Sequence, residues 1–223
     1  MCLLCITNKL PQTTYCERGL APNFWAEPIN ALANIAFIIA GYLGYRILKE
    51  HGVKSKELVI MPWLLSLVGL GSFIYHTARN SVTLIFDAVP IYVFILYALF
   101  LTLKYLFESK TKASLVLGGF FLLEVILSIY VPREFLNGSI RHLAAIVFIS
   151  ALGVLLFKKY GDKIKIPITS VIGLYGFAIL FRSVDMAVCD IVPIGTHFLW
   201  HTLAAFAGYN AIKLLVLMKA GKS

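Results

Sequence analysis

Long apolar runs fill most of the chain, and short clusters of Lys, Glu, Gly and Pro separate them. A helix needs about 20 apolar residues to cross the hydrocarbon core of a bilayer. The runs reach this length and lack the two-residue alternation of a membrane barrel, so we expect helices. The pattern predicts an all-α, polytopic membrane protein. Its seven expected transmembrane helices are Ile29–Leu48, Leu58–Thr77, Val82–Leu106, Ala113–Val131, Ile140–Phe157, Pro167–Val188 and Gly195–Leu217.

Prolines refine this plan. Pro28 and Pro167 suit the first turn of a helix, where the missing N–H has no helical partner to lose. Pro90 falls inside the third predicted helix, where it predicts a kink.

The opening residues lack a preceding basic region and a small-residue cleavage motif, so we expect no cleavable signal peptide. The expected parts are an N-terminal segment, a transmembrane domain and a tail, at residues 1–28, 29–217 and 218–223.

The composition supports a membrane protein: 60% of the residues are hydrophobic and 14% are charged. Soluble domains are about half apolar and a quarter charged, so this balance excludes that class. The net charge of +9 would suit a nucleic-acid partner, but the basic residues fall in short clusters between apolar runs. Such clusters are typical of the inner loops of membrane proteins, and we expect no nucleic-acid partner.

The basic residues also predict the orientation. The first, third and fifth loops and the C-terminal tail hold 14 of the 20 lysines and arginines. Cytoplasmic loops carry this excess, so an odd number of helices places the N-terminus outside or in a lumen and the C-terminus in the cytoplasm. The membrane is either a bacterial inner membrane or an endomembrane, and the short loops favour a microbial protein. The sequence does not indicate the oligomeric state.

Five ionisable side chains fall near the outer ends of the predicted helices: His76, Asp87, Asp185, His197 and His201. Ionisable groups in lipid are costly and by default mark function. His197 and His201 are four residues apart and share one helix face, a motif that also fits two hydrogen-bonded core histidines. His76 adds a third imidazole at the same depth. Three histidines with an open fourth position are typical of catalytic zinc, so we expect an intramembrane metal site near the outer face.

Two further side chains are candidates for catalysis. Asp87 lies in an apolar run and can serve as a general base or orient a ligating histidine. A structural aspartate there would need a buried partner, and Arg79 is the nearest candidate in sequence. Ser72 precedes His76 by one helical turn and can contact a developing oxyanion. The alternative for Ser72 is a hydroxyl bonded to the carbonyl four residues earlier.

Other polar residues within the helices have open roles. Arg182 and Asp185 are three residues apart and are candidates for a structural ion pair or for supporting the metal ligands. Glu124 lies in the middle of the fourth predicted helix. It either pairs across the bundle with Arg141 or His142 or faces a substrate cavity, and the sequence does not decide between these roles.

The four cysteines predict at least one disulfide. Cys16 precedes the first predicted helix and Cys189 follows the sixth, so both lie on the outer side, where oxidation is permitted. We expect a bond between them that ties the N-terminal segment to the outer loop beside the metal layer. Cys2 and Cys5 are candidates for a second pair.

Several segments together resemble a known family. They are YCE, AEPINALANIAF, GSFIYHT, IFDAVPIY, VDMAVCD and THFLWHTLAAFAGY, in this order along the chain. The set resembles the alkaline ceramidases, which belong to a wider group of seven-helix membrane proteins that includes the adiponectin-receptor type. The resemblance covers essentially the whole chain.

The resemblance implies roles for the candidate residues. His76, His197 and His201 would bind zinc. Asp87 would activate a metal-bound water, and Ser72 would support the tetrahedral intermediate. The two cysteines of the expected disulfide also match the family.

The family has, in addition, a calcium site in its N-terminal segment. Glu17 and Glu27 match two of its acidic ligands. Thr14 stands where the family has an aspartate, and Gly19 stands about where it has an asparagine. Calcium requires hard oxygen ligands, so the loss of two side chains leaves open whether calcium binds here.

The sequence therefore predicts a zinc-dependent hydrolase that cleaves the amide bond of ceramide or a related N-acyl membrane lipid. Two other classes fit less well. A receptor-like or regulatory protein with a structural zinc is one, and a transporter that uses the buried charges as an ion path is the other. A third alternative keeps the chemistry and changes the substrate to another lipid amide or an ester.

Overall fold

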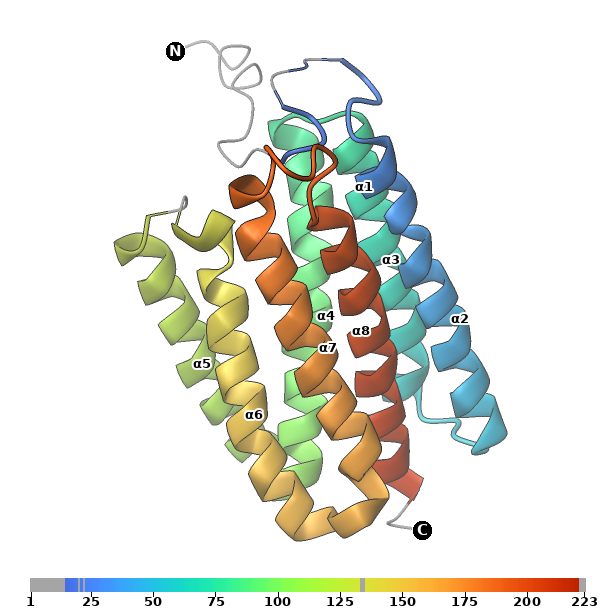
Figure 1. Ribbon diagram of the computed structural model, residues 1–223. Helices are drawn as coiled ribbons and strands as arrows, with labels where there is room; N and C mark the ends of the chain where they lie inside the picture. The colour runs from blue at the N-terminus through green and yellow to red at the C-terminus, as the bar shows by residue number, and fades with distance from the viewer. Residues whose placement is uncertain (1–14, 20, 22, 133–134, 221–223) are drawn as a thin grey trace.

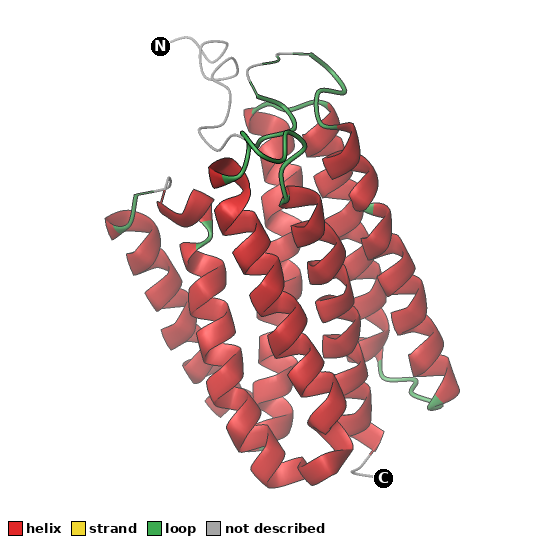
Figure 2. Cartoon of the chain, in the orientation of Figure 1, coloured by secondary structure: helices red, strands yellow, loops and turns green. Residues whose placement is uncertain are grey.

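The computed structural model describes residues 15–19, 21, 23–132 and 135–220, and over these residues it contains helices and loops but no strands (Figure 2). Short turns join long helices that run side by side (Figure 1). The long helices are α1 Pro28–Ala33 with α2 Ile35–Glu50, α3 Lys56–Thr77, α4 Ser81–Phe107, α5 Lys110–Tyr130, α6 Ile140–Tyr160, α7 Lys165–Val184 and α8 His197–Ala220. The short helices are η2 Phe135–Gly138, η3 Gly161–Ile164 and η4 Asp185–Ala187.

Six helical stretches in the described part of the chain are long and apolar enough to cross a membrane. One of them, Ile140–Ala187, contains both α6 and α7, and the chain reverses between these helices at η3 (Figure 1). Large apolar side chains also cover the outside of the bundle; Leu115, for example, is 72% exposed and Ile166 is 71% exposed. Such a surface is suited to lipid and not to water. The all-helical, multi-pass membrane architecture is confirmed, and the number of seven crossings remains a prediction.

Helix α8 is the central element of the bundle. It packs against α7, α2, α3 and α4, and Figure 1 shows it between α7 and α2. Small residues allow this packing: a Cβ atom on Gly208 of α8 would lie 2.5 Å from Leu65 of α3. Glycines at such positions bring membrane helices close together. By contrast, α5 packs only against α4 and α6 and stands at the edge of the bundle (Figure 1).

The helix boundaries agree with the predicted spans to within a few residues, with local exceptions. Pro28 is at the start of α1, and Pro167 is in the first turn of α7, as expected. The first predicted span is interrupted at Asn34, which separates α1 from α2. The side chain of Asn80 accepts hydrogen bonds from the backbone N–H groups of Val82 and Thr83, and this cap starts α4 at the end of the bundle where α3 ends.

Candidate metal centre

Three buried histidines meet at one end of the bundle. His76 is in the last turn of α3, and His197 and His201 are in the first turns of α8. One ring nitrogen from each lies within 4.8 Å of the others. The Nε2 atoms of His76 and His201 are 3.0 Å apart. The predicted cluster of imidazoles from two separated helices is therefore present.

The polar atoms of this cluster fit a metal ion. Neither ring nitrogen of His197 has a hydrogen-bond partner among the described residues, although the side chain is buried. Buried polar atoms are almost always paired, so unpartnered nitrogens beside two further imidazoles fit a site that binds a metal ion. Three imidazoles from a dry interior form a donor set that suits zinc and other transition metals.

Glu27 holds His76 in place. Its Oε2 atom is 2.5 Å from Nδ1 of His76, so the imidazole Nε2 faces the other two histidines. Its Oε1 atom accepts hydrogen bonds from Arg79, at 2.7 Å, and from Arg18. Burial alone would raise the pKa of Glu27, but the hydrogen bond with His76 and the positive charges of Arg79 and Arg18 lower that pKa to about 2. A carboxylate bonded to the second nitrogen of a ligating histidine is a common support for a metal site.

The acidic residues of the N-terminal segment do not fit a calcium ion. Both oxygens of Glu27 already accept hydrogen bonds from cationic or imidazole groups. Glu17 is also engaged, because its two oxygens accept the backbone N–H groups of Ile29 and Asn30 at the start of α1, at 2.5 and 2.8 Å. The guanidinium of Arg18 also donates to the backbone carbonyls of Ala21 and Asn23. The guanidinium of Arg18 thus lies against the carboxylate of Glu27, and among the described residues both acidic side chains of the matched calcium site already have protein partners.

Asp185 caps α8 and does not pair with Arg182. Its Oδ1 atom accepts hydrogen bonds from the backbone N–H groups of Thr196, at 2.6 Å, and His197, at 2.9 Å. Its Oδ2 atom accepts the backbone N–H of Cys16 at 3.1 Å. Gly195, the residue before Thr196, has a φ of +66°. A Cβ atom at this position would lie 2.2 Å from the Asp185 carboxylate, so only glycine fits there. Of the two roles considered for Arg182 and Asp185, the ion pair does not form, and the Asp185 carboxylate is instead turned towards the helix that carries two of the histidines.

Arg182 contacts aromatic rings beside the histidines. Its guanidinium lies 3.4 Å from the hydroxyl of Tyr15 and stacks over the ring of Trp200 at 5.3 Å. Tyr15 in turn stacks on His197, with 3.7 Å between ring centroids. Tyr15 was not predicted as a site residue from the sequence. Its position directly before Cys16 was the available signal, since a disulfide at that cysteine brings the neighbouring ring to the metal layer.

The disulfide between Cys16 and Cys189 is confirmed. It joins the N-terminal segment to the loop after η4, next to the carboxylate of Asp185. Cys2 and Cys5, with Thr14, lie outside the described residues. The disulfide therefore fixes the segment that supplies Tyr15, Arg18 and Glu27 to the site.

Ser72 is buried and Asp87 is partly buried, and neither has the structural partner that was considered for it among the described residues. The hydroxyl of Ser72 has no hydrogen bond to any described residue, so the expected alternative, a bond to the carbonyl four residues earlier, does not form. The Oδ1 atom of Asp87 is also buried and unpartnered in the described structure. Arg79 pairs with Glu27 and leaves Asp87 free. Asp87 instead lines a cavity together with Tyr15 and Arg182.

Glu124 does not form either of the pairs considered for it. No ion pair or hydrogen bond joins it to Arg141 or His142 in the part of the chain that the structure describes. His142 instead lies 2.9 Å from the hydroxyl of Tyr175. Glu124 instead lines a cavity, which agrees with the other role considered for it.

The fold and this cluster define a class: a multi-pass helical membrane protein with a buried three-histidine centre that can hold a metal ion. A family model described as Ceramidase matches residues 11–223, nearly the whole chain. The chain belongs to the ceramidase family. A search of curated proteins finds no significant match.

Proposed function

We propose that this protein is a zinc-dependent amidohydrolase of membrane lipids. It hydrolyses the amide bond of ceramide or a related N-acyl lipid and releases a fatty acid and a long-chain amine. Membership of the ceramidase family supports hydrolysis of this substrate class. The observation that carries the proposal is the meeting of three buried imidazoles, one of which, His197, has no hydrogen bond from either ring nitrogen to a described residue.

In this proposal His76, His197 and His201 would hold the zinc ion. Zinc bound there would polarise the amide carbonyl and bring the pKa of a water molecule close to neutral. Glu27 fixes the ring of His76 from behind, and Asp185 fixes the backbone of His197 by capping α8. The chain thus orients two of its three ligands with buried carboxylates.

Asp87 would transfer the proton, and Ser72 would stabilise the negative charge that develops on the carbonyl oxygen. Asp87 would take the proton from the attacking water and return it to the leaving nitrogen. Ser72 would donate a hydrogen bond to the oxygen that gains negative charge on the carbonyl carbon. Both side chains have polar atoms that are buried and unbonded in the described structure, so they are available to the substrate.

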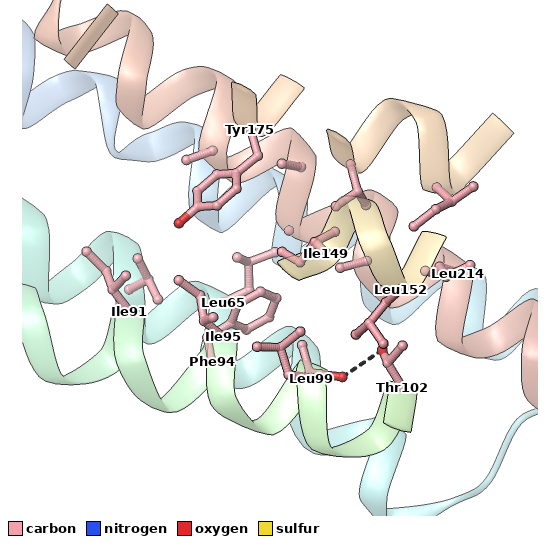
Figure 3. A pocket seen from close by; sticks show the side chains of 18 of the residues that line it. Leu65, Ile91, Phe94, Ile95, Leu99, Thr102, Ile149, Leu152, Tyr175 and Leu214 are labelled. Carbon is pink, nitrogen blue, oxygen red and sulfur yellow. Dashed lines mark hydrogen bonds between the residues drawn. The ribbon is translucent and has the colours of Figure 1, made fainter. Parts of the chain in front are cut away.

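An apolar cavity offers a place for a hydrocarbon chain. It lies among α2, α3, α4, α6, α7 and α8, and Figure 3 shows some of its side chains, among them Ile91 and Thr102 in the middle part of α4. The hydroxyl of Thr102 is bonded to its own helix, at the carbonyl of Ala98, and adds little polarity. Phe37 lines the cavity, and the centroid of its ring lies 6.4 Å from that of His201, so one part of the cavity lies beside the metal centre.

We infer the same membrane orientation as the distribution of basic residues indicates. Seven crossings would place the histidines, the disulfide and the N-terminal segment at the outer or luminal face, with the C-terminus in the cytoplasm. All of these features lie at one end of the bundle, at the top of Figure 1, and α8 ends at the other. An oxidising compartment at that end is consistent with a disulfide.

The test is fatty-acid release from ceramide by the purified, reconstituted protein. We expect turnover that a zinc chelator removes and added zinc restores. A panel of other N-acyl lipids and esters would define the substrate. Release of no fatty acid from any member of the panel, by zinc-loaded protein, would contradict the proposal.

A further inference from the structure

A polar cavity lies beside Asp87 at the same end of the bundle as the histidines. It has a volume of about 310 Å³, and Tyr15, Arg141 and Arg182 line it together with Asp87. A second cavity of about 240 Å³ includes Glu124. The two cavities adjoin, because they share lining residues from α4, α5 and α6: Tyr92, Ser128, Arg141 and His142.

Glu124 in this second cavity has no hydrogen-bond or ion-pair partner among the described residues. The side chain is 8% exposed, and neither carboxylate oxygen has a hydrogen bond to a described residue. Arg141 lines the same cavity, and its guanidinium stacks over the ring of Tyr92 at 5.2 Å and forms no ion pair with a described residue. A buried carboxylate in a membrane helix is costly unless it is bonded, and such residues mark ligand pathways.

The charges around the two cavities balance. Asp87 and Glu124 are acidic, and Arg141 and Arg182 are basic. An anionic head group, such as a phosphate, would add charge to a balanced set and would lie near two carboxylates. A neutral hydroxyl fits better, because it can donate to a carboxylate and accept from a guanidinium at the same time.

We propose that these cavities bind the hydroxylated polar head of the lipid substrate. A hydroxyl of the head donates to Glu124 and accepts from Arg141, while the amide lies at Asp87 and the histidines. The protein then selects N-acyl amino alcohols with a free hydroxyl over the deoxy and the phosphorylated analogues. This inference rests on the proposed amidohydrolase function and names the part of the substrate that the site recognises.

The test compares three substrates with the same acyl chain and base: the free alcohol, its deoxy analogue and its phosphate ester. We expect kcat/KM for the alcohol to exceed that for either analogue by about tenfold or more, since a buried charged partner would lose its hydrogen bond. In the Glu124→Leu variant, the ratio of kcat/KM for the alcohol to kcat/KM for the deoxy analogue should fall towards one. A ratio near one in the unmodified protein, or an unchanged ratio in Glu124→Leu, would overturn the proposal.

Thermal unfolding of the same variant separates binding from a structural role. An unpartnered buried carboxylate destabilises the protein without lipid, so Glu124→Leu should raise the melting temperature. A lowered melting temperature would show that Glu124 has a structural partner and would overturn the proposal. Glu57→Leu is the matched control, because Glu57 is paired with Lys104 at the opposite end of the bundle. It should not raise the melting temperature and should leave the substrate ratio unchanged.

A binding measurement keeps this inference distinct from the proposed function. If no amide is cleaved, the amidohydrolase proposal fails, and protection against thermal unfolding by free long-chain bases then decides the inference. A 2-amino-1-alcohol should raise the melting temperature more than its 1-deoxy analogue does, and Glu124→Leu should remove the difference. Equal protection by the two bases would contradict a hydroxyl subsite.

Discussion

Glu27 is the residue on which most of the site's polar contacts converge. Its carboxylate joins His76 to Arg18 and Arg79 in a buried cluster. Glu27→Gln removes the negative charge and leaves the positive charges of two buried guanidinium groups without a carboxylate partner. We expect a loss of about 3–5 kcal/mol of stability and a loss of about 10–100-fold in metal affinity. Thermal unfolding and metal titration measure both effects.

Glu17→Gln is the control for this prediction. The carboxylate of Glu17 caps α1 and contacts no histidine. Its substitution should leave metal affinity unchanged. Equal loss of metal affinity in Glu17→Gln and Glu27→Gln would show that the N-terminal segment acts as a whole and that Glu27 has no specific role at His76.

Asp87 offers a second prediction at the residue scale. Asp87→Asn keeps the shape of the side chain and removes its ability to accept a proton. Turnover should fall by about 100-fold or more, because a positioned base contributes this much to proton transfer. Metal content and melting temperature should stay the same or rise, since Arg79 pairs with Glu27 and not with Asp87. Full activity in Asp87→Asn would contradict its role as the base.

At the scale of the elements, the start of α8 depends on Asp185. Asp185→Ala leaves the backbone N–H groups of Thr196 and His197 unpaired. We expect a loss of about 1–3 kcal/mol in stability and weaker metal binding, because His197 would lose its fixed position. The control is Asp190→Ala, an exposed carboxylate in the same loop, which should change neither stability nor metal binding. Unchanged metal affinity in Asp185→Ala would contradict this account of the cap.

Much of the architecture could be predicted from sequence. Apolar runs long enough for a membrane predict the helices, and the positions of His76, His197 and His201 at helix ends predict their cluster. The contacts of Asp185 could not be predicted, because they depend on the loop after η4, which folds back onto the carboxylate. A spacing of three residues suggested Arg182 as its partner, and nothing local in the sequence indicates that the chain turns away.

The N-terminal segment was the other limit of sequence reasoning. The family resemblance pointed to calcium at Glu17 and Glu27, whereas the buried contacts of Glu27 are with Arg18, Arg79 and His76. Arg79 is distant in sequence, and its pairing depends on the close approach of this segment to the end of α3. Only the disulfide at Cys16 indicated beforehand that the segment lies beside the metal layer.

At the scale of the whole molecule, the ion requirements follow from these contacts. Chelation of calcium by EGTA, with zinc kept constant, should change neither the melting temperature nor the rate of fatty-acid release. The reason is that Arg18 occupies the position next to Glu27. Activation or stabilisation of the unmodified protein by added calcium would contradict this interpretation.

The measurement that most directly tests the central claim is the metal content of the purified protein, determined by inductively coupled plasma mass spectrometry. The account predicts about one zinc ion per chain in the unmodified protein and almost none in the double variant His76→Ala/His201→Ala, because both substitutions remove imidazoles from the same buried centre. Equal zinc content in the two proteins, or no zinc in the unmodified protein after incubation with zinc, would contradict the account.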